Sequence, residues 1–248
     1  MAEERNTTSA SAMSRERRDS QSSDTAATSG GEVRLRADAR QNRDQLIQAA
    51  RELVLEEGSN TPLEGIARRA GVGVGTLYRR FPDREALLRA VALDTLAQVT
   101  QEAELALTEE AEPFAALARY MQRVVALRVG AVMPALVGAL PPHETAIFDA
   151  RDAAVMPVQA LIDAAQAAGT LRADVDFSDI GLLTARLSQP LPGPFPRAVA
   201  DALAQRHLTI LLDGLRSTPG TAATPLPGPA LSLREIQGEN IAPTPERD

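Results

Sequence analysis

The sequence contains no cysteine, no tryptophan and no lysine, and only 3% of its 248 residues are aromatic. The absence of cysteine excludes a disulfide scaffold, a thiol nucleophile and a thiolate metal site. It also fits a reducing compartment, so a cytoplasmic location is expected. All 26 basic residues are arginines, so any cationic contact to a phosphate or a base would be made by a guanidinium.

Membrane, metal and catalytic signals are also missing. No run of about 18 apolar residues occurs, so no membrane span is expected. The charged N-terminus has no apolar segment of the kind found in a secretory signal. The two histidines, His143 and His207, belong to no ligand or catalytic pattern, and the acidic run of residues 102–112 is interpreted as a solvated helix face. No catalytic site, metal site or cofactor is predicted.

Composition divides the chain into four parts. Residues 1–33 are rich in serine, threonine and charge, and residues 217–248 contain six prolines, so both are predicted to be disordered tails. Residues 34–91 have 11 arginines against 8 acidic residues, whereas residues 92–216 have 9 against 15. A small cationic module thus precedes a larger anionic body, which favours nucleic acid as a partner at one end.

The stretch between the tails is rich in alanine and leucine and predicts an all-α fold. Apolar residues at helical spacing predict nine helices. The expected ranges are 42–57, 62–70, 75–81, 83–107, 113–129, 131–140, 144–168, 177–188 and 196–215. Gly58 and Gly71 are expected to end the first two helices, Asp83 to cap the fourth, and Gly130 to separate the fifth from the sixth.

The second and third expected helices form a helix-turn-helix. The side chains expected on its buried face are Leu63, Ile66, Ala67, Leu77 and Phe81. The polar groups left for the outer face are those of Thr76, Tyr78, Arg79 and Arg80. Hydroxyl and phenol groups hydrogen-bond to phosphate, and arginine can also take guanine O6 and N7 bidentately. The alternative is a helical hairpin whose arginines are merely solvated.

The glycines of residues 71–76 do not form a nucleotide-binding loop. The G-x-G-x-x-G pattern requires glycine where Thr76 stands, and the Walker pattern requires the absent lysine. The segment also follows a helix rather than a strand. It is interpreted as the turn of the helix-turn-helix.

Residues 66–87, IARRAGVGVGTLYRRFPDREAL, resemble the DNA-binding signature of the TetR-type repressor family. Residues 168–175 and the two helices after them look like the C-terminal body of the same family. The resemblance implies a three-helix helix-turn-helix DNA-binding domain over residues 34–91. It further implies a helical domain over residues 92–216 that dimerises and binds a small-molecule effector.

The resemblance also implies roles for single residues. It places Thr76, Tyr78, Arg80 and Arg84 at phosphates. It places Val74, Gly75 and Arg79 at or near base edges. The family usually has a serine at the position of Gly73 and a polar residue at that of Val74, which is left here to contact a thymine methyl. From charge alone, Arg34, Arg36, Arg40 and Arg43 are expected to form an arm against phosphates or the minor groove.

The last two expected helices, residues 177–188 and 196–215, are predicted to form a homodimer interface. The second has apolar residues around much of its circumference, so one face can enter the core and another a partner. A single buried helix in a monomer is the alternative. The candidate effector contacts, chosen as adaptable apolar side chains, are Phe114, Met121, Val125, Met133, Phe148 and Met156.

Together these predictions describe a homodimeric repressor that binds a palindromic operator in double-stranded DNA and is released by a small apolar effector. The alternative is a helical small-molecule sensor that acts through protein contacts, with weak or no specific DNA binding. Sequence-specific duplex binding separates the two. An enzyme is disfavoured, because no nucleophile–base pair or metal-ligand cluster stands out.

Overall fold

The computed structural model describes residues 37–141, 144–191, 193, 195–217 and 224–228. The predicted tail of residues 1–33 and most of that of residues 217–248 lie outside these ranges, as do His143, Arg34 and Arg36. Regular structure in the described ranges is helical, as predicted, and the β contact found there is an isolated antiparallel bridge between Leu171 and Arg216.

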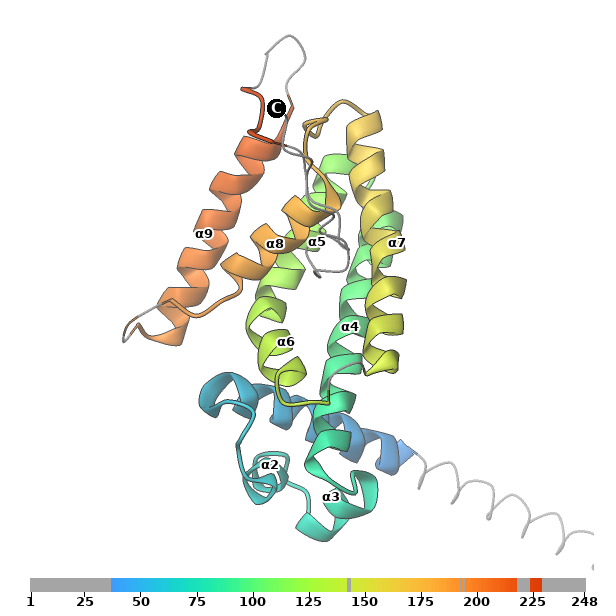
Figure 1. The fold of residues 1–248 in the computed structure, drawn as a ribbon, viewed down its shortest axis with the longest axis vertical. Coiled ribbons are helices and arrows are strands. Elements are labelled where there is room, and N and C mark those ends of the chain that lie inside the picture. The colour runs from blue at the N-terminus through green and yellow to red at the C-terminus, as the bar shows by residue number, and fades with distance from the viewer. Residues whose placement is uncertain (1–36, 142–143, 192, 194, 218–223, 229–248) are drawn as a thin grey trace, which may run out of the picture.

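A first helix occupies residues 37–57, and eight labelled helices follow it (Figure 1). They are α2 (Leu63–Arg69), α3 (Val74–Arg80), α4 (Arg84–Glu109), α5 (Pro113–Ala126), α6 (Val129–Val137), α7 (Thr145–Ala167), α8 (Phe177–Leu187) and α9 (Arg197–Leu215). The predicted helices agree closely with these in order and extent. The first one differs, because the chain is already helical at residue 37, before the expected start at Asn42.

The predicted ends of the helix-turn-helix segment are confirmed by backbone geometry. Gly58 follows the first helix with a φ of 88°, and Gly71 follows α2 with a φ of 67°. Both lie in the left-handed region, which glycine adopts without steric cost. Asp83 caps α4, because its carboxylate accepts a hydrogen bond of 2.7 Å from the backbone N–H of Ala86.

The predicted break between α5 and α6 at Gly130 is wrong. The chain turns instead at Arg128, whose φ of 55° is left-handed. Gly130 lies inside α6, where it faces α8 at very close range. A Cβ at this position would lie 2.6 Å from Ala185 Cα and closer still to the carbonyl oxygen of Ala185. The glycine is therefore required by the approach of two helices rather than by a turn.

Two clusters of buried apolar side chains make up the interior, and α4 belongs to both. One cluster joins the first helix, α2, α3 and the first half of α4 to Val132 and Leu136 of α6. The other begins on α4 at Val99 and includes residues of α5, α7, α8 and α9. In Figure 1, α4 rises from the end formed by α2 and α3 into the larger helical body. It passes residue 91, the predicted domain boundary, without a break.

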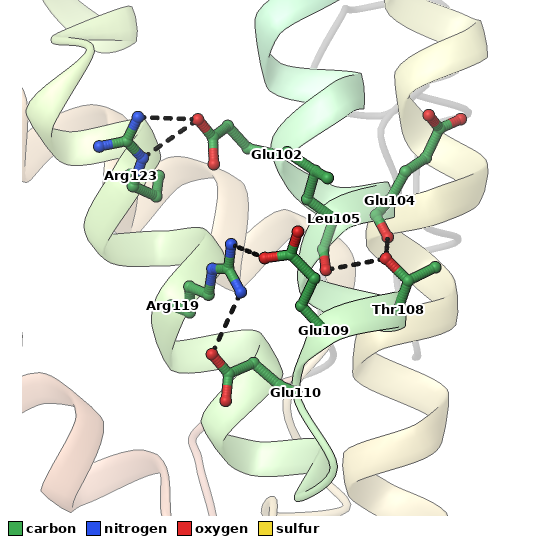
Figure 2. Close-up of polar contacts among 8 residues, drawn as sticks. All are labelled: Glu102, Glu104, Leu105, Thr108, Glu109, Glu110, Arg119 and Arg123. Carbon is green, nitrogen blue, oxygen red and sulfur yellow. Dashed lines mark hydrogen bonds and ion pairs between the residues drawn. The ribbon is translucent and has the colours of Figure 1, made fainter.

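The acidic run of residues 102–112 packs α4 against α5 through arginine. The ion pairs, drawn in Figure 2, are Arg123–Glu102 (2.9 Å), Arg119–Glu109 (2.5 Å) and Arg119–Glu110 (3.2 Å). Glu112 caps α5 by accepting from two backbone N–H groups of its first turn. Across the described part of the chain, no group of side chains has an arrangement that could hold a metal ion.

Taken singly, the helices of the described residues differ from membrane spans in length and composition. No single helix is long and apolar enough to cross a bilayer. Taken together, α5 and α6, which meet at a bend of 53°, meet the length and composition criteria. Both contribute buried side chains to the two cores.

Candidate functional site

The helix α3 is held in place by its apolar side, which packs in the core formed with the first helix, α2 and α4. Leu77 is completely buried in this helix, and Phe81 directly after it is also buried. The α2 residues of the predicted buried face, which are Leu63, Ile66 and Ala67, are buried as well. The predicted inner face of the helix-turn-helix is thus confirmed. Its packing orients α3 relative to α2 and α4.

The opposite side of α3 is open to solvent. Tyr78 is 45% exposed and Val74 38% exposed, and Gly75, Arg79 and Arg80 are also exposed. Thr76 is half-buried. Because α2 and α3 lie at one end of the molecule (Figure 1), this surface is accessible to a large partner. A phenol and two guanidiniums are therefore presented together from one short helix.

Among the described residues, the two arginines of α3 use only a small part of their donor capacity. Arg79 Nη2 donates to Thr76 Oγ1 at 3.0 Å, one turn earlier on the same helix. Arg80 Nη2 donates to the carbonyl oxygen of Ala39 at 2.9 Å. A guanidinium has five N–H donors, so most of them are still available for phosphate or base acceptors.

The other two predicted cationic contacts lie beside α3 rather than on it. Arg84 starts α4 and donates from Nη1 to the carbonyl oxygen of Ser59 at 2.7 Å, which ties α4 to the loop after the first helix. Arg43 lies on the first helix, 3.7 Å from Asp44. Arg40 is on that helix too, so these arginines are presented from a helix and not from an extended arm.

A polar network between the first helix and α4 was not foreseen. Arg51 Nη2 donates to Asp94 at 2.7 Å, and its Nη1 donates to Gln98 at 3.0 Å. Burial lowers the pKa of Arg51, and the charge of Asp94 opposes this shift. The partners are more than forty residues apart in sequence, so local spacing carries no signal for the pairing. The network holds the first helix on α4.

A cavity of about 610 Å³ lies between α4, α5, α6, α7 and α8. Among the predicted effector contacts, Met133 and Phe148 line it. The remaining four, Phe114, Met121, Val125 and Met156, do not. The first three are buried among the packed helices, and Met156 is 75% exposed on α7. Phe114 instead packs under the guanidinium of Arg216, which lies 4.1 Å from its ring centre.

Sequence reasoning missed several polar residues of this cavity, which are Tyr120, Glu144, Arg151 and Arg186. Glu144 accepts from Arg89 of α4, at 2.9 Å from Nε. This hydrogen bond lowers the pKa of Glu144, and burial raises the pKa of Tyr120. The ion pair between Glu144 and Arg89 therefore links the wall of the cavity to α4.

The helices α8 and α9 leave apolar side chains uncovered. On α9, Leu208, Leu212 and Leu215 are buried, while Ile210 is 62% exposed. Leu182 of α8 and Val199 of α9 are likewise exposed, as is His207. The apolar residues of α9 therefore lie on two sides, one in the core and one at the surface.

An outward-facing helix-turn-helix at one end of a helical body with an internal cavity defines a helix-turn-helix transcriptional regulator. Residues 46–91 match the family model described as bacterial regulatory proteins, tetR family, and residues 112–217 match the C-terminal domain of SbtR-like transcriptional regulators. The chain belongs to the TetR family of transcriptional regulators.

Solved structures agree with this assignment over the length of the relatives. A TetR transcriptional regulator from Streptomyces coelicolor is 35% identical, with a TM-score of 0.56, covering 71% of this chain and 99% of that one. A TetR regulatory protein from Mycobacterium vanbaalenii is 34% identical, with a TM-score of 0.54, covering 73% and 99%. An HTH-type transcriptional regulator of Staphylococcus aureus is 43% identical over 54 residues, which are 21% of this chain and only 29% of that relative.

Proposed function

We propose that the protein is a homodimeric repressor that binds a palindromic operator through α3 and is released by a small effector. In this proposal residues 34–91 read DNA, and residues 92–216 hold the effector and the dimer contact. The observation that carries it is the division of α3, with Leu77 buried and with Tyr78, Arg79 and Arg80 on the accessible side. Such a helix fits the major groove.

The proposed contacts fall into two kinds. Tyr78, Thr76, Arg80 and Arg84 bind phosphate oxygens and set the position of the helix on the duplex. Arg79 reaches base edges, where its guanidinium can pair with guanine O6 and N7. Val74 and Gly75, at the start of α3, lie close to the bases, and Arg43 adds a phosphate contact from the first helix. No lysine shares these tasks.

The proposed dimer uses α8 and α9 around a two-fold axis. Exposed Leu182, Val199 and Ile210 supply apolar surface for a symmetric contact. Two copies of α3 related by this axis would meet successive major grooves about 34 Å apart. A palindromic operator follows from this symmetry.

Replacing Ile210 with glutamate is expected to shift the protein from dimer to monomer. Because each protomer of a two-fold dimer contributes one glutamate, two unpaired carboxylates would enter the interface. The dimer dissociation constant should therefore rise by roughly a hundredfold or more. Sedimentation over a range of concentrations measures the change. The matched control is Met156→Glu, at an apolar residue that is even more exposed but lies on α7. A dimer that survives Ile210→Glu would exclude this face.

Release by an effector requires coupling between the cavity and α3. The cavity is lined by Leu96 and Val99 of α4, and the same helix shares a buried core with the first helix, α2 and α3 through Leu88 and Val91. An occupant that favours one placement of α4 would change the separation of the two copies of α3. Changing operator occupancy from nearly full to nearly empty takes about 5.5 kcal/mol of differential affinity.

The test of DNA recognition starts with selection of bound sequences from random duplex. The Tyr78→Phe variant is then titrated on the selected operator and on unrelated duplex by gel shift. Loss of one phosphate hydrogen bond per half-site should weaken binding several-fold on every sequence, without changing base preference. The salt dependence should stay the same, because no charge is removed.

The chain supplies a matched control for this variant, because it has only two tyrosines. Tyr120 is buried in the wall of the cavity, so Tyr120→Phe removes a hydroxyl that cannot reach DNA, and without added effector it should leave operator affinity unchanged. Equal affinities for wild type and Tyr78→Phe would remove Tyr78 from the contact. Weak binding by the wild type that ignores sequence would favour a sensor that acts through protein contacts.

A further inference from the structure

The cavity between α4 and α8 is apolar along most of its wall. Side chains of Val99, Met133 and Val158 are among those that line it. Val137 and Phe148 also line it and are exposed to solvent, so the cavity can be entered at these residues. A wall of this kind suits a hydrocarbon body.

Glu144 is the acidic side chain among the described lining residues, and its charge is already balanced by an arginine. Glu144 accepts hydrogen bonds from Arg89 Nε at 2.9 Å and from Arg89 Nη2 at 2.5 Å. These bonds lower the pKa of Glu144, so its carboxylate is ionised and paired at neutral pH. It therefore offers no free negative charge to an occupant.

Two guanidiniums line the same cavity. Arg151 comes from α7 and Arg186 from α8. Over the part of the chain that the structure describes, no carboxylate oxygen lies within 4.0 Å of a guanidinium nitrogen of either residue, so neither forms an ion pair there. Tyr120 adds a phenol. Burial raises the pKa of this phenol, so it stays protonated and can donate a hydrogen bond. These polar groups are hydrogen-bond donors, and the net charge they give the wall is positive.

We propose that the cavity binds an amphipathic carboxylic acid, with its hydrocarbon body on the apolar wall and its carboxylate held by Arg151 and Arg186. A guanidinium matches a carboxylate in shape and charge and binds it with two parallel hydrogen bonds. Arg151 is half-buried and Arg186 is exposed, so the carboxylate end of the ligand would stay at the solvent-accessible side of the cavity while its hydrocarbon body is buried. The inference rests on the proposed function of the cavity as the effector site and narrows it to one chemical class.

Calorimetric titration of the full-length protein with dodecanoate and with 1-dodecanol tests this proposal. The two probes share the same chain and differ in the charged group, so dodecanoate should bind at least about tenfold more tightly. Arg151→Gln and Arg186→Gln should each weaken dodecanoate binding by about tenfold or more while leaving dodecanol binding unchanged. Arg68→Gln, which removes an exposed arginine of α2, is the control and should bind dodecanoate like wild type.

Equal binding of the acid and the alcohol would overturn the proposal, and so would full dodecanoate affinity in the Arg151→Gln, Arg186→Gln double variant. Absence of any dodecanoate binding would overturn it as well. Gel shifts on the selected operator are run on the same samples. If the operator is bound while dodecanoate is not, the ligand class is wrong and DNA recognition stands. If dodecanoate binds while no operator is found, the proposed DNA recognition is wrong and the ligand class stands.

Discussion

The Gly130→Ala protein is expected to be less stable than wild type by about 3 kcal/mol or more. The added Cβ would overlap the backbone of Ala185, which cannot move aside as the end of a flexible side chain can. To admit it, α6 and α8 must separate, which also strains the 3.3 Å hydrogen bond from Gln189 Nε2 to the Gly130 carbonyl. The melting temperature, followed by circular dichroism, should fall by roughly 6–12 °C.

The control for this substitution is another helical glycine. At Gly65 of α2, an added Cβ would lie 3.9 Å from Thr61 Cγ2, which is ordinary van der Waals contact. Because alanine is favoured over glycine in a helix by up to about 1 kcal/mol, Gly65→Ala should be as stable as wild type or more so. If Gly130→Ala melted like Gly65→Ala, α6 and α8 would not be packed as closely as described.

The Arg79→Ala protein is expected to bind its selected operator at least roughly thirtyfold more weakly than wild type. A bidentate contact to a base contributes about 1–3 kcal/mol of discrimination, and the dimer loses it at both half-sites. The bond to Thr76 that is also removed is solvent-exposed, so the stability of the protein should hardly change. Gel-shift titration at fixed salt measures the affinity. Repeated selection should show relaxed preference at one base pair of each half-site.

Arg123→Ala provides the comparison, since it removes an exposed arginine from α5. Its side chain pairs with Glu102 on the surface (Figure 2), and an exposed ion pair contributes about 0–1 kcal/mol to stability. Operator affinity should be unaffected. An Arg79→Ala protein that loses affinity equally on all sequences would reassign Arg79 from the bases to the phosphates.

The order and type of the helices were predictable because their signals are local. Gly58 and Gly71 end helices through their own backbone freedom, and Asp83 caps α4 with an acceptor three residues from its donor. The spacing of Leu77 and Phe81 likewise shows which side of α3 must be buried. The division of that helix into an inner and an outer side therefore follows from sequence.

Features that depend on distant partners were not predictable. From sequence, Gly130 predicts a helix break, because the close approach that requires this glycine comes from Ala185 on another helix. The cavity residues show the same limit. Phe114 has the side chain expected for an effector contact but is used in packing, whereas Arg151 lines the cavity and carries no local pattern that sets it apart.

The length and composition of α4 have a mechanical consequence. Its 26 residues, about 39 Å end to end at 1.5 Å per residue, contain neither glycine nor proline and run from one core into the other. Without a hinge along it, the helix acts as a lever arm. A tilt of about 5° at Val99, which borders the cavity, would displace the start of the helix at Arg84, about 22 Å away, by about 2 Å.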